Sequence, residues 1–240
     1  MSKNGRHTFS VAIIGADGAG KTTIAKRLEA SFPQSVKYLY MGVNVGSSNV
    51  ALPSSRLIEY AKKMVKKKRN QSNGQAVPAV SAERESKLKI LWRPIRLVNR
   101  LAEEWYRQFL SWKYRRSGHI VIYDRHFKFD YELPRSQNGQ QKRHITDWLH
   151  RWCLAHLFPQ PDLVIFLDAP PEILQARKPV EDPKLSREEY HQYLVERQQA
   201  FLNQGKTIRN FQRVDATRNP EDVYLQVTKC MQRYSPARKY

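Results

Sequence analysis

The chain has 240 residues, with 42 lysines and arginines against 22 aspartates and glutamates, which gives a formal net charge of +20. This length suits one α/β domain better than two, and so large a positive charge favours anionic partners such as nucleotides, phosphorylated compounds, nucleic acid, polyphosphate or acidic membranes. No run of about 18 apolar residues occurs, and the first residues lack the apolar stretch of a signal peptide. We therefore expect a cytoplasmic protein without a membrane-spanning segment.

Short apolar runs alternate with helical patterns from the N-terminus onward. A first strand is expected at residues 11–14, and after a glycine loop residues 22–28 have a helical pattern. A second strand is predicted at residues 36–43. Further on, a strongly basic helix at 55–69 leads into a segment, about 70–82, whose composition is typical of a mobile loop.

A long helix is predicted to resume near Glu83, with Pro94 starting or kinking it. Its apolar residues recur at spacings of three and four and indicate one apolar face: Leu91, Ile95, Val98, Leu101, Trp105, Phe109 and Trp112. A second such stripe consists of Ile145, Trp148, Leu149, Trp152 and Ala155. Because tryptophans at helical spacing usually pack in a core, we expect these residues to be buried rather than to stack on bases.

Three further strands are predicted at residues 119–123, 163–167 and 212–215, with helical segments between them. The helix that follows Ser186 carries a capping signature, because Glu189 stands three residues after the serine. Alternating strands and helices predict an α/β fold in which helices flank a five-stranded parallel sheet. We expect a single domain over residues 1–240.

The residues between the first strand and the first helix read G-A-D-G-A-G-K-T and match G-x-x-x-x-G-K-[ST] in full. In such a loop backbone N–H groups turn toward phosphate oxygens, the lysine reaches the terminal phosphates and the threonine hydroxyl binds Mg²⁺. This pattern is that of a P-loop. An ordinary glycine turn after a strand would not need to match it at all eight positions. The residues expected to bind ATP here are Gly15, Asp17, Gly18, Ala19, Gly20, Lys21, Thr22 and Thr23.

Acidic residues end two more strands. Asp124 precedes Arg125 and His126 after the third strand, and Asp168 follows the fourth. Ligands of open α/β sheets collect at the carboxyl ends of the strands, so both aspartates join Thr22 as candidate magnesium-site residues. A surface ion pair for Asp124 and Arg125, and a helix cap for Asp168, are the structural alternatives.

If a phosphate chain bound in the glycine loop donates a phosphoryl group, we expect the molecule that accepts it to bind near the aspartate of that loop. Asp17 would face the acceptor, because a carboxylate beside phosphates is unfavourable unless it points away. The residues expected to line the acceptor side are Asp17, Arg125, His126, Lys128, Asp130 and Tyr131. A basic lid at about 177–187 could close over the transferred group, with Arg177 as its catalytic cation, although solvated charges would give the same composition. The expected catalytic residues are Lys21, Asp17, Asp124, Arg125 and Arg177.

Three motifs resemble thymidylate kinases and thymidylate-kinase-like proteins, in the same order along the chain: G-x-D-G-x-G-K-T, Y-D-R-H and PDLVIFLDAPPEILQARK. The resemblance implies a P-loop kinase that uses ATP and Mg²⁺ and transfers the γ-phosphoryl group to an acceptor, a nucleoside monophosphate in the enzymes that give the family its name. It further implies that Ala216 and Thr217 lie against the adenine and that Arg177 belongs to the lid. The P-loop contains no arginine, which resembles the variants whose catalytic cation is in the lid.

The acceptor half departs from that family. Thymidylate kinases usually have an arginine-proline element after the second strand, where this chain reads MGVNVGSSNVALPSS. After D-R they have a serine and an A-Y-Q stretch, where this chain reads HFKFDYELPRSQ. The sequence therefore predicts phosphoryl transfer without specifying the acceptor.

Two alternatives stay open at this level. A polyphosphate-dependent nucleotide kinase would also pair a P-loop with a D-R strand end. A non-catalytic nucleotide-binding module could instead dock nucleic acid or a membrane through the basic helix at 55–69. The sequence also leaves open whether the chain forms a homodimer.

Overall fold

The structure is a computed structural model of the chain, and it describes residues 8–42, 52, 60, 79–132, 145–178 and 185–234. Nearly all of the basic helix expected at 55–69 lies outside these ranges. The same holds for most of the expected loop at 70–82 and of the expected lid at 177–187.

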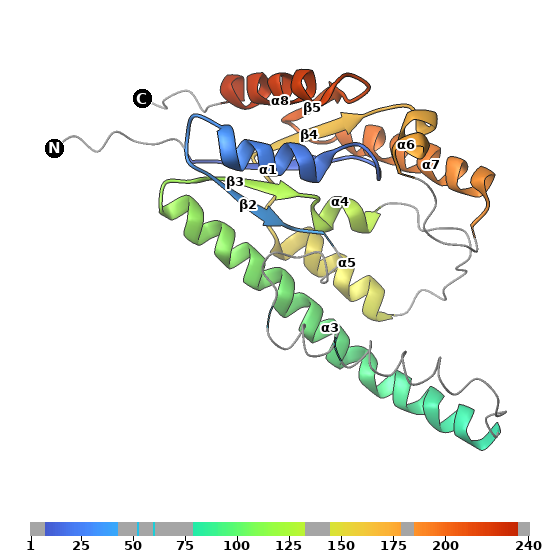
Figure 1. The fold of residues 1–240 in the computed structure, drawn as a ribbon. Helices are drawn as coiled ribbons and strands as arrows, with labels where there is room; N and C mark the ends of the chain where they lie inside the picture. The colour runs from blue at the N-terminus through green and yellow to red at the C-terminus, as the bar shows by residue number, and fades with distance from the viewer. Residues whose placement is uncertain are drawn as a thin grey trace.

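Five parallel strands form one sheet in the order β2-β3-β1-β4-β5 (Figure 1). The strands are β1 (Ser10–Ile14), β2 (Val36–Tyr40), β3 (Ile120–Asp124), β4 (Leu163–Asp168) and β5 (Phe211–Asp215). The five expected strands and the α/β class are therefore confirmed. Because β1 lies between β3 and β4, the loop that follows β1 meets the ends of both neighbours at one edge of the sheet.

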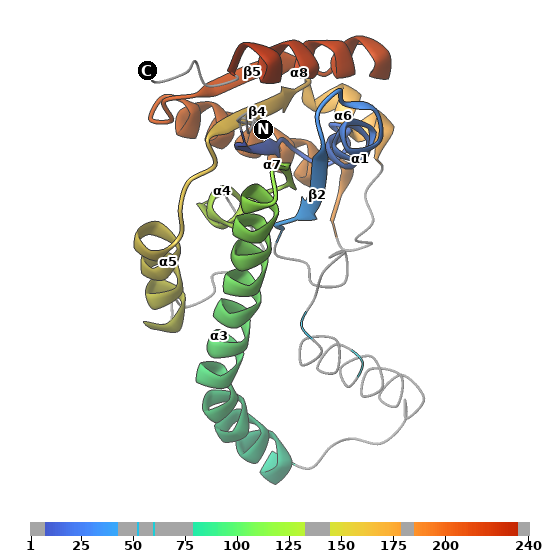
Figure 2. The same cartoon turned by 90° about the vertical axis from the view of Figure 1, so that its left-hand side faces the viewer.

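Helices cover both faces of the sheet because the central strands are apolar on both sides. Val11 and Ile13 of β1 pack into one buried cluster, whereas Ala12 and Ile14 pack into the other. The helices are α1 (Lys21–Ser31), α3 (Ala79–Arg116), α4 (Phe127–Glu132), α5 (Ile145–Leu157), α6 (Pro171–Arg177), α7 (Arg187–Gly205) and α8 (Pro220–Tyr234). Helices α1 and α8 contribute to the first cluster and α4 and α5 to the second, while α7 contributes to both. Figure 2 shows the same layers from the side.

The long helix α3 extends well beyond the sheet in both views (Figures 1 and 2). It begins at Ala79 rather than near Glu83, and it contains Pro94 inside its length. The structure contradicts the expected burial of its apolar stripe, because Val98, Trp105, Phe109 and Trp112 are exposed by 66%, 47%, 54% and 52%. Trp148, Leu149 and Trp152 of α5 are exposed as well.

The side of α3 that faces the protein is partly polar, with Leu101, Leu110 and Tyr114 packed on the second buried cluster. Its buried residues include Glu103, Glu104, Arg107 and Ser111. Arg107 donates to Glu103 at 3.0 Å, and Glu104 lies 2.8 Å from Nε2 of His150 on α5. Burying polar or charged groups costs much less free energy when they are paired than when they are single. These pairs therefore lie at the interface where the helical periodicity predicted the tryptophans. Within the described ranges, no helix has the combined length and apolar character needed to cross a bilayer.

The capping signature predicted at the start of α7 is confirmed. Ser186 Oγ accepts a hydrogen bond from the backbone N–H of Glu189 at 3.1 Å, and the Glu189 carboxylate accepts one from the N–H of Ser186 at 2.8 Å. Replacing Ser186 with alanine should therefore lower the free energy of unfolding by about 1 kcal/mol, measured by urea denaturation. The matched control Ser117→Ala, at an exposed serine whose hydroxyl donates to the Lys113 carbonyl, should stay within about 0.5 kcal/mol of the wild type. Equal losses in the two variants would contradict the capping role.

Candidate active site

The loop after β1 has the backbone that phosphate binding requires. Gly18 and Gly20 have φ values of 86° and 85°, a left-handed conformation that favours glycine. A Cβ on Gly18 would also lie 2.7 Å from the carbonyl oxygen of Leu174. Gly20 is the N-cap of α1, so the loop opens onto unpaired N–H groups and the positive end of the helix dipole. Thr23 is exposed in the first turn of that helix.

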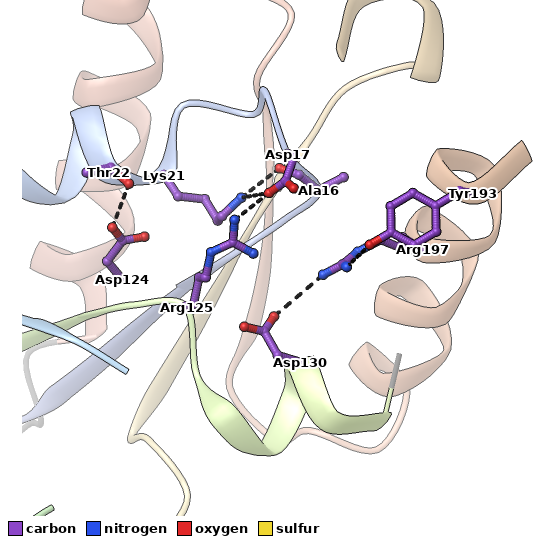
Figure 3. Close-up of polar contacts among 9 residues, drawn as sticks. All are labelled: Ala16, Asp17, Lys21, Thr22, Asp124, Arg125, Asp130, Tyr193 and Arg197. Atoms are coloured by element: carbon purple, nitrogen blue, oxygen red, sulfur yellow. Dashed lines mark hydrogen bonds and ion pairs between the residues drawn. The ribbon is translucent and has the colours of Figure 1, made fainter. Parts of the chain in front are cut away.

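Lys21 lies buried beside the loop. Its Nζ donates to the carbonyl oxygen of Ala16 at 2.7 Å and lies 3.9 Å from Asp17 Oδ1 (Figure 3). Burial, assisted by the nearby Arg125 guanidinium, lowers the pKa of Lys21 to about 7. The Asp17 carboxylate raises the pKa of Lys21 but does not outweigh burial, so the lysine is only partly charged at neutral pH.

Asp124 ends β3 directly opposite the start of α1, and it is fully buried. Its Oδ2 accepts hydrogen bonds from Thr22 Oγ1 at 2.6 Å and from the Tyr38 hydroxyl at 2.9 Å. Its Oδ1 is buried without a hydrogen-bond partner among the described residues. A spare carboxylate oxygen next to a threonine hydroxyl is the donor set that Mg²⁺ and its bound waters use, so Thr22 and Asp124 fit the metal.

Arg125 and Asp17 form an ion pair between the end of β3 and the P-loop (Figure 3). Arg125 has a φ of 66°, which is uncommon for a residue other than glycine. Burial by itself would raise the pKa of Asp17, but the charges of Arg125 and Lys21 outweigh it and lower the pKa to about 2. The loop carboxylate is therefore ionised and held in place.

A second pair of charges reaches the same space from α4 and α7. Asp130 Oδ1 lies 3.7 Å from Nη2 of Arg197, and the Arg197 guanidinium also donates to the Tyr193 hydroxyl (Figure 3). Burial raises the pKa of Asp130, against the opposing effect of Arg125 and Arg197. Arg197 was not among the residues predicted from the sequence, although one signal was present. The arginine shares a helical face with the buried residues Leu194 and Phe201, where a cation is unexpected.

His126 lies in the core behind these pairs. Its ring is fully buried among Tyr123, Phe127 and Phe129, with ring centroids 5.4, 4.5 and 5.2 Å away. Burial, with a smaller contribution from Lys128, lowers the pKa of His126 to about 3, so the ring is neutral at physiological pH. This packing favours a structural role, and contact of His126 or Lys128 with the acceptor stays a prediction.

Asp168, at the end of β4, accepts hydrogen bonds from two other elements. It accepts hydrogen bonds from Gln198 of α7 at 2.6 Å and from Nε of Arg213 on β5 at 2.6 Å. Both carboxylate oxygens therefore have protein partners, and the metal role expected from the sequence stays a prediction.

Arg177 contacts the segment after β5. Its guanidinium donates to the carbonyl oxygens of Ala216 at 2.7 Å and Thr217 at 3.2 Å. The Thr217 hydroxyl in turn donates to Asp215 at 2.6 Å. The structure thus joins the end of α6 to the segment expected to lie against the adenine, while the catalytic role of Arg177 stays a prediction.

Comparison with solved structures identifies similar folds. Three structures of a deoxyadenosine kinase from M. mycoides, described with dCMP and dCDP, with dCTP and with dATP, match over 93% of this chain and 99% of theirs. Their TM-scores are 0.50, 0.50 and 0.51, at 16%, 17% and 18% sequence identity. No family model matches the sequence, and no curated protein does. At this identity the likeness establishes the fold, which is that of P-loop kinases, and thymidylate kinase itself stays a prediction.

The buried Lys21 should make the free protein less stable. Its pKa is about 7 in the folded chain and near 10.5 in the unfolded chain, so unfolding takes up protons between these values and the cost is greatest below pH 7. We expect Lys21→Met to raise the free energy of unfolding on the order of 2 kcal/mol near pH 7, with the gain shrinking as pH rises toward 10. Lys26→Met, at an exposed position on the same helix, serves as the control. Denaturant unfolding from pH 6 to pH 10 measures both, and a gain that did not change with pH would refute the assignment.

Proposed function

We propose that the protein is an ATP- and Mg²⁺-dependent phosphotransferase that moves the γ-phosphoryl group of ATP to a small acceptor. The observation that carries this proposal is the complete P-loop with Lys21 buried beside the Thr22–Asp124 hydrogen bond at one edge of the sheet. The acceptor is a nucleoside monophosphate in the family that the motifs resemble. The structures of similar fold include those of a deoxyadenosine kinase, which makes nucleosides a second acceptor class.

The donor would occupy the P-loop. Residues 15–20 and the start of α1 would bind the phosphate chain through backbone N–H groups, and Lys21 would exchange its contact with Ala16 for the terminal phosphates. Thr22 and Asp124 would hold Mg²⁺, which would neutralise charge on the phosphates when bound. Ala216 and Thr217 would lie against the adenine, and the contact with Arg177 would fix that segment.

The acceptor would enter beside Asp17. Its nucleophilic oxygen would form a bond to the γ-phosphorus while the bond to the β,γ-bridging oxygen breaks, and ADP would leave with that electron pair. The Asp17 carboxylate, held by Arg125, would orient the acceptor oxygen. Where that oxygen belongs to a hydroxyl group, Asp17 would accept its proton late in the transfer, when even a carboxylate with a low pKa suffices.

A label-transfer screen tests the proposed function. Wild-type protein with γ-labelled ATP and Mg²⁺ is incubated with nucleosides, nucleoside monophosphates and sugars, and polyphosphate is compared with ATP as donor. Label should pass to one class of acceptor, and Lys21→Ala should reduce the rate at least about a hundredfold because it removes a cation from the transferred group. Lys26→Ala on the same helix is the matched control. Failure of calorimetry to detect Mg·ATP binding to the wild type would overturn the proposal.

The magnesium assignment has its own test. Asp124→Asn keeps a hydrogen-bond partner for Thr22 but removes the charge that faces the metal, so the Mg²⁺ concentration for half-maximal activity should rise about tenfold or more. Titration of activity against Mg²⁺ at saturating ATP measures this change. Glu188→Gln, which removes an exposed acid from the first turn of α7, should leave the titration unchanged. An unchanged titration in Asp124→Asn would place the metal elsewhere.

A further inference from the structure

Three largely buried arginines surround the space beyond the P-loop, and each has a carboxylate next to it. Arg125 is paired with Asp17, and Arg107 donates to Glu103 at 3.0 Å. The third pair joins Arg197 to Asp130 at 3.7 Å. Within these three pairs the positive charge is cancelled by the protein itself.

The pairs lie close to one another. Figure 3 shows Arg125 and Arg197 approaching from opposite sides, with Asp17 and Asp130 between them. Arg107 donates to the carbonyl oxygen of Gly42 at 2.8 Å, and a Cβ on Gly42 would lie 2.8 Å from Cδ of Arg125. This side of the site therefore combines several charges with little net charge.

Such a site is poorly suited to a phosphorylated acceptor. A phosphate monoester carries roughly two negative charges at neutral pH and needs cations that are not already compensated. Binding it here would separate a buried carboxylate from its arginine. Residues 41–55, the segment that follows β2, contain no lysine or arginine that could bind the phosphate instead.

A hydroxyl group fits the same site well. The Nε of Arg197 is buried without a hydrogen-bond partner among the described residues, and the 3.7 Å separation from Asp130 is too long for a hydrogen bond. Together the pair thus offers an N–H donor and a carboxylate acceptor side by side. A hydroxyl both accepts and donates, whereas an ionised phosphate only accepts.

We propose that the acceptor is an uncharged hydroxyl compound of the nucleoside class, and that the Asp130–Arg197 pair selects it over the corresponding monophosphate. This inference rests on the proposed function and names its acceptor class. In the reaction the acceptor hydroxyl oxygen bonds to the γ-phosphorus, its proton passes to Asp17, and ADP leaves with the electrons of the broken bond. The product is a phosphate monoester, so a reaction that consumes nucleoside monophosphates must follow it.

Matched acceptors test the inference. Wild-type protein, γ-labelled ATP and Mg²⁺ are incubated with thymidine or dTMP and with deoxyadenosine or dAMP, and kcat/KM is measured for each. The wild type should prefer at least one nucleoside over its monophosphate by tenfold or more. Asp130→Asn leaves Arg197 uncompensated, so the ratio should move at least tenfold toward the monophosphate while the KM for ATP stays unchanged. Arg197→Gln should raise the nucleoside KM about tenfold, again with an unchanged KM for ATP.

The control is Glu196→Gln, which removes a negative charge from the neighbouring position of α7, where Glu196 contacts Gln192 instead. It should leave the acceptor ratio as in the wild type. Three results would overturn the inference: a wild-type preference for the monophosphates, label in neither class of acceptor, or an unchanged acceptor ratio in Asp130→Asn. The first of these would leave the proposed function intact. Absence of Mg·ATP binding by calorimetry would overturn the proposed function and the inference together.

Discussion

The ion pair between Arg125 and Asp17 connects the two halves of the site. Its arginine follows β3 and its aspartate follows β1, so the pair depends on these strands being neighbours in the sheet. The backbone N–H of Arg125 donates to the carbonyl oxygen of Ile13 at 3.1 Å, which continues the strand pairing by one residue. The left-handed conformation of Arg125 then directs its side chain to the P-loop. Such a conformation costs on the order of 1 kcal/mol, and a charge-assisted hydrogen bond in a partly buried site can offset it.

Charge acts differently at long and short range in this molecule. The net charge of +20 creates a field that attracts anions such as ATP from solution. Inside the site, by contrast, arginines are paired with carboxylates and burial lowers the pKa of Lys21. A triphosphate at the P-loop would restore the charge of that lysine. Binding an anion would therefore be favourable on the donor side. On the acceptor side, where carboxylates already compensate the arginines, anion binding would gain less.

The sequence predicted the features that depend on neighbouring residues. The strands, the P-loop and the cap formed by Ser186 and Glu189 each follow from local spacing. Features set by contacts between distant segments were not predictable in the same way. The stripe with Trp105 and Trp112 has the periodicity of a buried face, yet helical spacing cannot reveal that Glu103 and Arg107 would pair and occupy the interior. Likewise, nothing in the local sequence indicates which helix supplies the partner of Asp130.

Hydrogen bonds to Asp168 help to position Arg197, the partner of Asp130. The Asp168 carboxylate accepts hydrogen bonds from Arg213 of β5 and from Gln198, the residue after Arg197. The pairing of β4 with β5 places Arg213 beside Asp168, and the bond to Gln198 then fixes α7 in height and rotation over the sheet. Residues next to each other on a helix point about 100° apart, so anchoring Gln198 at the sheet determines where the Arg197 side chain points. Asp168, whose metal role stays a prediction, thus also connects the sheet to the helix that carries Arg197, the partner of Asp130.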